Sequence, residues 1–540
     1  MLNYIWVALL FLGIGAAVST DIINKNDNKY RNNTPLTVTI QFDSVSIKNP
    51  GKCNTAKIII SKESYNKFYD DKTDHDLSFV ATLICLDKNN KYSIHLIIDK
   101  NIPLTLQEIA SASGDKNDIS GTLVLGKYLN NTSAEAGLVL ENVNFLKLKD
   151  ITNAALDYAG IAVNIALGLI GVMALWLGVM KVAESAGLIT KIASGLKPFT
   201  RRLFPDVPVD HPAMGAMIMN MSANMLGLGN AATPFGLKAM EELDTLNPEK
   251  GTATNSMITF LAINTAGMTL IPASAIAIRA ASGSSDPAII IGTSLFGSFC
   301  ATIAGILSAK LLQNISLGYK QWYKNNAKLL ISIILIVTIT ISSLLIPWTK
   351  NIGNIFIGLK LGLIKDIIQV FSIIAIPLLI VFFIGYGVFR KVKVYEQFVE
   401  GAKEGFNIAI RILPYLVAML VAIGIFRAGG AMQWLITALT PLTNLIGMPA
   451  EALPMALMRP LSGSGSLGVM SEIIRVHGPD SFIGILVSTF YGSTETTFYV
   501  LAVYFGAVNI KNTRHAVPVG LIADICGILG ALFIVKLLFS

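Results

Sequence analysis

The stretch NMSANMLGLGNAATP, residues 220–234, lies between long apolar segments, yet it is small, polar and rich in glycine. A second stretch of the same character, RPLSGSGSLG at residues 459–468, lies near the C-terminus. Lipid offers no hydrogen bonds to an exposed backbone, so an irregular polar stretch among membrane helices must be buried in protein or line a wet cavity. We therefore predict that the two stretches face each other and form a small-solute site inside an integral membrane protein.

The composition around these stretches is that of a polytopic membrane protein. Only 14% of the 540 residues are charged, against about 25% in a typical soluble protein. The deficit comes from runs of roughly 20 apolar residues, long enough to cross a bilayer core; residues 329–348 and 367–389 contain no charge at all. The net charge of +8 lies largely in loops between such runs, which is typical of cytoplasmic loops and does not indicate nucleic-acid binding. Membrane lipid is therefore an expected partner, and nucleic acid is not.

The N-terminal residues 1–23 are predicted to form a transmembrane helix or signal anchor around the apolar run 2–18. A cleaved signal peptide is the competing interpretation, since Ala17-Val18-Ser19 is an acceptable cleavage site. The absence of a basic segment before the apolar run favours an uncleaved helix.

Residues 24–150 differ in character from the rest and predict a small β-rich domain. Alternating β-type runs separated by turn signals lie at residues 36–42, 57–61, 79–85, 92–98, 121–125 and 137–145. His75 and His95 have no clustered partner with metal-ligand spacing, so we expect no metal site there. Whether Cys53 and Cys85 form a disulfide is left open by the sequence. The basic loop 181–202 is expected in the cytoplasm, which makes the β-rich domain extracytoplasmic.

The membrane part follows in two halves, predicted as domains 151–325 and 396–540 with linking helices at 326–395. The first half has spans at 155–180, 254–280 and 288–309 and a broken helical hairpin at 211–229 and 231–243. The linking spans are 329–348 and 367–389. The second half has spans at 406–426, 482–510 and 517–535, an interfacial helix at 430–445 and a second broken hairpin at 452–469.

The two halves align as an internal repeat at an offset of 243 residues. Asn164-Ile165-Ala166 matches residues 407–409, and Gly187 and Pro198 match Gly430 and Pro441. The basic loops place residues 155–180 running inward and residues 406–426 running outward, so the topology is inverted. Transporters built from inverted repeats bind solute near the bilayer midplane, where helices are discontinuous. The predicted fold is an all-α polytopic membrane protein of two inverted repeats with broken or re-entrant hairpins, plus the small β-rich domain.

Three motifs resemble a known family. NMSANMLGLGNAATPFGLKAMEEL at residues 220–243 resembles the signature of the spore maturation A type, and RPLSGSGSLGVMSEI at 459–473 and FYGSTETTFYVLAVYFGAV at 490–508 resemble the B type. Both types belong to the nucleoside recognition, or Gate, domain family, so the chain resembles a fusion of the two over roughly residues 152–540. The resemblance implies a part in common with nucleoside and ferrous iron transporters, and an association with spore maturation. It implies no catalytic residues, and it says nothing about residues 24–150.

The candidate substrate-binding residues are small and polar and lie at the interruptions of the apolar runs. Such residues also let helices pack closely, and for a single Ser or Thr that interpretation is favoured, whereas the whole cluster with its helix break favours solute contact. The set comprises Asn220, Ser222, Asn224, Asn230, Thr233, Asn264, Thr265, Thr269, Arg459, Ser462, Ser464, Ser466, Ser493, Thr494, Glu495 and Thr496.

Arg459 and Glu495 are the charged members of this set. A charge at membrane depth is rare and usually functional. In one interpretation Glu495 binds a coupling proton or cation while Arg459 contacts substrate; in the other, the two form a buried pair that joins two segments. Asp524 is a second intramembrane carboxylate with less polar company. No cofactor is expected beyond that unidentified coupling ion.

The leading functional hypothesis is a permease for a small polar solute in a bacterial inner membrane, with nucleosides suggested by the resemblance alone. The alternative is a non-transporting scaffold or sensor that acts in the cell envelope or in spore maturation through its β-rich domain. A membrane-embedded hydrolase using Ser464, His477 and Asp480 is a weak third hypothesis, and we expect no enzyme. A homo-oligomer is left open.

Overall fold

The computed structural model describes residues 2–42, 54–87, 91–98, 102–113, 118–129, 132–227, 232–313, 327 and 361–539. Asn230, Cys53 and the predicted span 329–348 lie outside the described residues. The chain forms two compact units. One, here called the barrel unit, comprises Val7–Asp157 and Gly424–Trp434; the other, the membrane unit, comprises Met1–Trp6, Tyr158–Ile423 and Leu435–Ser540.

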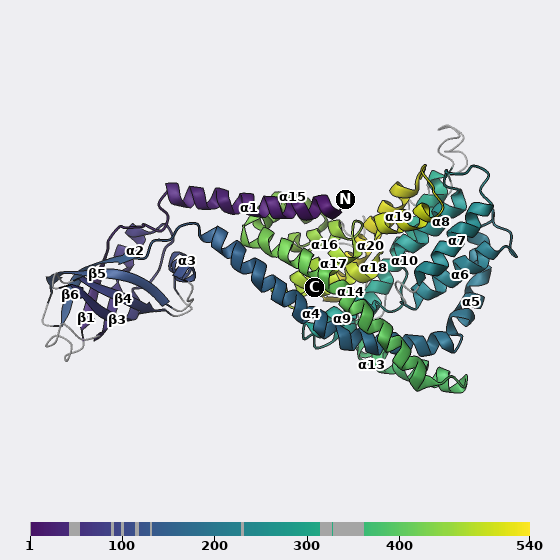
Figure 1. The fold of residues 1–540 in the computed structure, drawn as a ribbon, viewed down its shortest axis with the longest axis horizontal. Helices are drawn as coiled ribbons and strands as arrows, with labels where there is room; N and C mark the ends of the chain where they lie inside the picture. Colours follow the sequence, from purple (N-terminus) through teal and green to yellow (C-terminus); the bar gives the residue numbers. More distant parts are fainter. Residues whose placement is uncertain are drawn as a thin grey trace. The chain divides into compact units, whose positions relative to one another are not determined.

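The barrel unit contains six antiparallel strands that close into a barrel (Figure 1). The strands are β1 (Leu36–Phe42), β2 (Asn54–Ile60), β3 (Leu77–Asp87), β4 (Lys91–Ile97), β5 (Asp118–Tyr128) and β6 (Ser133–Leu140). Each strand pairs with the next, and β1 closes the barrel by pairing with β6, Leu36 opposite Leu138. Each of the six predicted runs therefore contains a strand, but the last, 137–145, is a strand only as far as Leu140. Closure was not predicted, because alternation specifies which face is buried and not which strands pair.

The barrel interior is filled by alternate residues of the strands and by α3 (Leu104–Ser113). In β1 the side chains of Leu36, Val38 and Ile40 are buried, whereas Thr37 between them is exposed and Thr39 is half-buried. A short helix, α2 (Lys62–Phe68), follows β2 and is capped by Ser61. Neither helix was predicted from the sequence.

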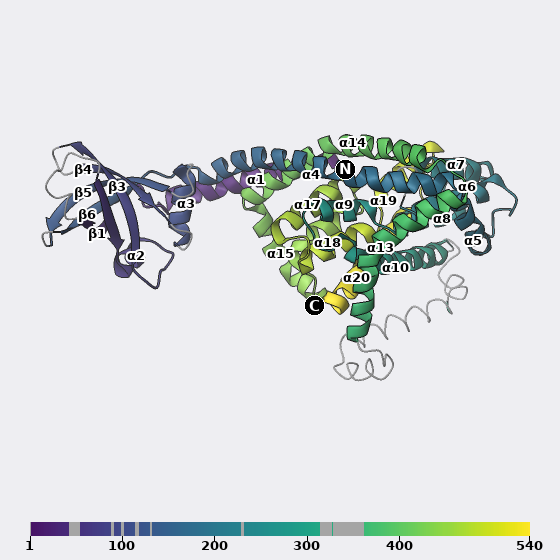
Figure 2. The same cartoon turned by 90° about the horizontal axis from the view of Figure 1, so that it is seen from below.

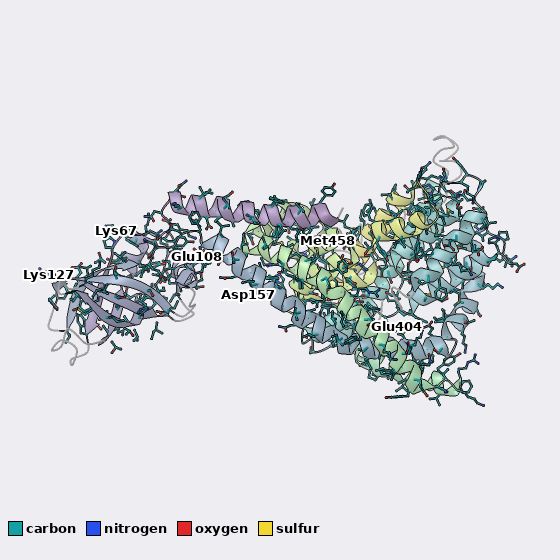
Figure 3. The ribbon with its side chains drawn as sticks, viewed as in Figure 1. Lys67, Glu108, Lys127, Asp157, Glu404 and Met458 are labelled. Atoms are coloured by element: carbon teal, nitrogen blue, oxygen red, sulfur yellow. The ribbon has the colours of Figure 1, made fainter. Side chains whose placement is uncertain are left out.

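A polar contact ties α3 to the segment before β1. Glu108 of α3, labelled in Figure 3, accepts hydrogen bonds from Lys29 Nζ at 2.6 Å and from the Tyr30 hydroxyl at 3.1 Å. Burial and the neighbouring Glu108 carboxylate raise the pKa of Tyr30. The phenol therefore stays neutral and continues to donate its hydrogen bond at any ordinary pH.

Five helices among the described residues are long and apolar enough to cross a membrane, which makes the protein a multi-pass membrane protein. They are α1 (Leu2–Asn26), α4 (Leu146–Ser185), α10 (Ile290–Leu312, with a preceding 3-10 turn), α14 (Val394–Ala428) and α20 (Ala516–Phe539). The predicted span 367–389 is the helix α13 (Leu361–Phe389).

The remaining helices of the membrane unit confirm the repeat in their order. The first half runs α4, α5 (Leu188–Leu203), α6 (Pro212–Met225), α7 (Thr233–Thr245), α8 (Asn255–Ala266), α9 (Ala273–Ala281) and α10. The second half runs α14, α15 (Ala431–Ile446), α16 (Leu453–Met458), α17 (Gly463–His477), α18 (Phe482–Ser493), α19 (Thr497–Ala507) and α20. Gly187 before α5 and Gly430 before α15 both have positive φ, +80° and +89°, and Pro198 and Pro441 lie inside the equivalent helices.

Equivalent helices of the two halves run antiparallel where they touch. A Cβ atom at Gly401 of α14 would meet the backbone of Leu177 in α4, and one at Gly405 would meet Met173, so the numbering rises along one helix as it falls along the other. Figure 2 shows α4 and α14 alongside each other. Helices α10 and α20 behave in the same way. Antiparallel contact between equivalent helices is what a two-fold axis perpendicular to them produces, and this is the relation expected of inverted repeats.

Two predicted spans are not continuous. Residues 254–280 divide into α8 and α9, at the interruption where the candidate residues Asn264, Thr265 and Thr269 were noted. Residues 482–510 were expected to form a single helix, but the structure breaks this segment between α18 and α19, at residues 494–496. The physical reason is a tertiary hydrogen bond, since the Glu495 amide donates to the carbonyl of Thr265 at 2.7 Å instead of to a carbonyl of its own helix. The second hairpin also differs from the predicted 452–469, because its second arm, α17, continues to His477.

Candidate functional site at the crossing of four interrupted helices

Four chain interruptions converge in the membrane unit. Two separate the arms of the hairpins: in the first, α6 ends at Met225 and α7 begins at Thr233, and in the second, residues 459–462 lie between α16 and α17. The other two divide the broken spans, residues 267–272 between α8 and α9 and residues 494–496 between α18 and α19. Each half of the repeat thus supplies one hairpin and one broken span, and we call their meeting point the crossing.

Backbone hydrogen bonds hold the crossing together. In each half an amide of the broken span donates a hydrogen bond to a carbonyl of the hairpin, and a third hydrogen bond joins the two halves. These bonds run from Leu270 N to Met225 O at 2.8 Å, from Phe498 N to Pro460 O at 3.1 Å and from Glu495 N to Thr265 O at 2.7 Å. Backbone groups released by the breaks thereby find the partners that a membrane interior cannot supply.

Gly267 makes the closest approach between the halves possible. It ends α8 in the left-handed region with φ of +55°, and a Cβ atom there would lie 2.6 Å from Cγ of Glu495. Both the backbone conformation and the lack of space favour glycine at this position.

Three predicted residues, Asn220, Asn224 and Asn264, come together with Tyr504 in a polar group that we call the amide cluster. Asn224 Nδ2 donates to Asn264 Oδ1 at 2.9 Å, and the Tyr504 hydroxyl donates to the same oxygen at 3.3 Å. Asn220 Nδ2 donates to the Ala232 carbonyl at 2.9 Å and lies 3.2 Å from the Tyr504 hydroxyl. The cluster therefore joins α6, α7 and α8 of the first half to α19 of the second.

Tyr504 was missed by the sequence analysis because it lies in an apolar run, where an aromatic residue suggests lipid or core packing. One signal was available, because the hydroxyl of a buried tyrosine needs a hydrogen-bond partner. The asparagines of the first hairpin are residues that could provide one. Its ring also stacks on Phe260 of α8, with centroids 5.9 Å apart.

Arg459 and Glu495 form the predicted pair, also at the crossing. Arg459 Nη2 lies 3.7 Å from Glu495 Oε2 and donates to the Thr494 carbonyl. Its guanidinium also lies over the Tyr491 ring, 4.4 Å from the centroid. The two partners differ in exposure, since the Arg459 side chain is 2% exposed and that of Glu495 is 49% exposed.

Several buried polar atoms around this pair have no hydrogen-bond partner among the described residues. They are Thr265 Oγ1, Thr494 Oγ1, Thr496 Oγ1 and Arg459 Nε. Buried polar atoms are nearly always paired, so this concentration of unpaired donors and acceptors marks the place where a polar ligand would gain most.

The other candidates mainly stabilise the helices. Ser222, Ser466 and Ser493 each donate to the carbonyl four residues earlier, at 2.6–2.7 Å. Ser462 caps α17 by accepting from Gly465 N at 3.0 Å. For these four hydroxyls the packing interpretation describes their observed contacts. The half-buried candidates are Thr233, Thr269 and Ser464.

A family model described as nucleoside recognition, Gate, matches residues 166–282 and 409–511 and so covers both hairpins and both broken spans. Spore maturation protein B of Bacillus subtilis is 52% identical over 175 residues, which is 32% of this chain and 98% of that protein. The chain belongs to the Gate family. Spore maturation protein A of Bacillus subtilis is 46% identical over 160 residues, 30% of this chain and 82% of that protein, in a separate part of the chain. No solved structure matches the chain significantly.

A second connection joins the two Gate segments away from the crossing. The buried Arg279 at the end of α9 donates to Asp480 Oδ1 at 2.9 Å and to Ser284 Oγ at 3.0 Å. Asp480, before α18, also accepts from the amide and hydroxyl of Ser285, both at 2.8 Å. Burial alone would raise the pKa of Asp480, but the hydrogen bonds from Ser284 and Ser285 and the Arg279 charge outweigh it and lower the pKa.

These contacts do not assemble the hydrolase triad considered from the sequence. Asp480 is engaged by Arg279 and the two serines, and in the described part of the chain no hydrogen bond joins it to His477 or Ser464. A hollow of about 300 Å³ at the start of α8 is lined by Asp206, Glu249 and Arg514, among others, and none of the candidate residues line it.

Proposed function

We propose that the membrane unit moves a small polar solute across the membrane through the crossing. The observation that carries this proposal is the half-exposed Glu495 side chain in the middle of an apolar unit. A carboxylate facing lipid is strongly disfavoured, so an exposed one among membrane helices faces water or a polar ligand. A water-accessible acid beside buried, unpaired polar atoms is the arrangement that a solute pathway requires.

The chemistry of the crossing suits a neutral solute with several hydroxyl and amide-like groups. The amide cluster offers carboxamide donors and acceptors, Arg459 offers a cation, and Tyr491 and Tyr504 offer aromatic faces. A nucleoside combines a hydroxylated sugar with a flat base, and the description of the Gate family points to the same class. The sequence has no Walker A motif, so an ion or solute gradient would supply the energy.

Uptake into proteoliposomes tests this proposal. Radiolabelled nucleosides, with radiolabelled sugars and amino acids for comparison, are expected to enter faster than into protein-free liposomes. Glu495→Gln is expected to slow uptake at least tenfold. Glu404→Gln is the matched control, because Glu404 of α14, labelled in Figure 3, is also about half exposed but lies away from the crossing. Absence of uptake for every solute, or equal effects of the two substitutions, would refute the proposal.

A second candidate is a scaffold or sensor that acts through the barrel unit. It is favoured by apolar residues on the outer surface of the barrel, where Val80 of β3 and its cross-strand partner Ile97 of β4 are both more than half exposed. Ile84, Leu86 and Val124 add to this surface. Deleting residues 24–150 discriminates the two candidates, since a scaffold would lose its cellular function and a permease would keep most of its uptake.

We further propose that the protein lies in a bacterial inner membrane with the barrel unit on the extracytoplasmic side, as the basic segment 181–202 indicates. This segment was predicted as a loop, but it forms the end of α4 and most of α5. In a variant whose four native cysteines are replaced by serine, a cysteine introduced by Lys127→Cys at an exposed position of β5 (Figure 3) is expected to react with a membrane-impermeant maleimide in spheroplasts. Reaction only after lysis would contradict this orientation.

A further inference from the structure

A second carboxylate lies deeper in the membrane unit than Glu495. Asp524 is in the middle of the apolar helix α20, and its side chain is fully buried. Its Oδ2 accepts a hydrogen bond from Thr497 Oγ1 at 2.5 Å, and its Oδ1 has no partner among the described residues. One carboxylate oxygen thus accepts a hydrogen bond from a hydroxyl, and the other accepts none from the described residues.

No cation pairs with Asp524 in the described part of the chain. Helix α20 packs against α8, α10, α18 and α19. Of these, α8 carries no titratable group and α18 carries only Tyr491, whose ring lies under Arg459. The titratable groups of α10 and α19 are Cys300, Lys310, which donates to the Leu203 carbonyl, and Tyr499 and Tyr504. The charges that act on Asp524 are Arg459 and Glu495, which are opposite in sign and already paired with each other.

An ionised carboxylate in such surroundings lacks the counter-charge that would stabilise it, and a buried acid without a counter-charge takes up a proton instead. Oδ1 makes no hydrogen bond to a described residue, so it is the carboxylate oxygen that can bind this proton. We propose that Asp524 is the proton-binding site of the membrane unit and, if the proposed transport function holds, the site of its coupling proton.

The position of Thr497 connects this site to the crossing. Thr497 is the first residue of α19 and directly follows the break at residues 494–496, which contains Glu495. Hydrogen bonds to an ionised acceptor are roughly twice as strong as bonds to a neutral one. Protonation of Asp524 therefore weakens the hydrogen bond that holds Thr497, in the first turn of α19 and close to Glu495. Deprotonation strengthens the same hydrogen bond.

This assignment separates the roles of the two acids. Glu495 is half exposed and its charge is balanced by Arg459 at 3.7 Å, which suits contact with a polar solute. Asp524 is sealed from solvent in this structure and has no balancing charge, which suits storage of a proton. In one of the two interpretations of the sequence Glu495 binds the coupling ion, whereas the geometry favours Asp524 as the site of a proton.

Infrared difference spectroscopy on the full-length protein in lipid nanodiscs tests the proposal. A titration from acid to alkaline pH is expected to show the C=O stretch of a protonated carboxyl group that disappears as the pH rises. Labelling the side-chain carboxyl carbon of aspartate with ¹³C should move that band, and labelling glutamate should not. This readout needs no substitution, so it holds even where a variant fails to fold.

Three variants assign the band to one residue. Asp524→Asn is expected to abolish it, Glu495→Gln to leave it, and Thr497→Val to shift its frequency because the hydrogen-bond partner is lost. A band that survives Asp524→Asn, that moves with labelled glutamate, or that responds to sodium at constant pH would overturn the assignment. Absence of solute uptake with the band intact would refute transport alone, which keeps the two proposals separable.

Discussion

Gly267 offers the most direct test of the crossing, because a single added methyl group at this position would meet the other half of the repeat. In Gly267→Ala the backbone of the new alanine must keep a φ of +55°, which costs roughly 1–2 kcal/mol for a residue with a Cβ atom. The Cβ would also lie 2.6 Å from Cγ and 3.1 Å from the amide nitrogen of Glu495. That amide is fixed by its hydrogen bond to Thr265, so the overlap adds about 1–3 kcal/mol.

The expected total is a loss of roughly 2–5 kcal/mol in the free energy of unfolding. Gly283→Ala is the matched control, because Gly283 has a φ of +78° and open space around its missing Cβ, so it incurs only the backbone part. Reversible unfolding of the purified protein in mixed micelles of increasing SDS content, followed by circular dichroism, measures both variants. If the two substitutions destabilise the protein equally, the close approach of Gly267 and Glu495 is wrong.

Two further predictions follow from the polar contacts of the membrane unit. Asn264→Leu should destabilise the protein by about 1–3 kcal/mol, because it leaves the Asn224 amide and the Tyr504 hydroxyl without their acceptor; adding Tyr504→Phe should recover part of that loss, and strict additivity in SDS unfolding would contradict the shared contact. Because the pKa of Asp480 is lowered in the folded protein, its ionised carboxylate contributes fully to stability above about pH 4. That contribution is lost as the pH falls through the pKa that Asp480 has in the folded state. Asp480→Asn should therefore flatten the acid limb of the stability curve below pH 4, and an unchanged limb would show that the contact with Arg279 and its serines contributes nothing there.

Much of the membrane unit could be predicted from the sequence because its signals are local. Glycine, proline and small polar residues among apolar runs mark the two hairpins and the break after Gly267, and the matching order of segments predicts the repeat. The barrel strands follow in the same way from their alternating pattern. The inverted relation depended on the distribution of basic loops, and the antiparallel contact of α4 with α14 supports it independently.

The features that the sequence did not predict depend on tertiary contacts. The segment YGSTETTFY around residues 494–496 has no proline and would continue as a helix if the Thr265 carbonyl did not compete for the Glu495 amide. Tyr504 joins the amide cluster only because α19 lies against α6 and α8. Closure of the barrel depends on the pairing of its first and last strands, which no local pattern encodes. The Arg459–Glu495 pair was predicted as a contact, whereas the different exposure of its two members was not.

The hydrogen bond from the Glu495 amide to the Thr265 carbonyl has a consequence for how this polypeptide is built. Its donor and acceptor belong to different repeats, and so do Tyr504 and Asn264 in the amide cluster. Neither repeat alone can complete these contacts, so the smallest complete assembly contains one copy of each. Carrying both on a single polypeptide fixes that one-to-one stoichiometry at translation and makes their association independent of the abundance of the protein in the cell.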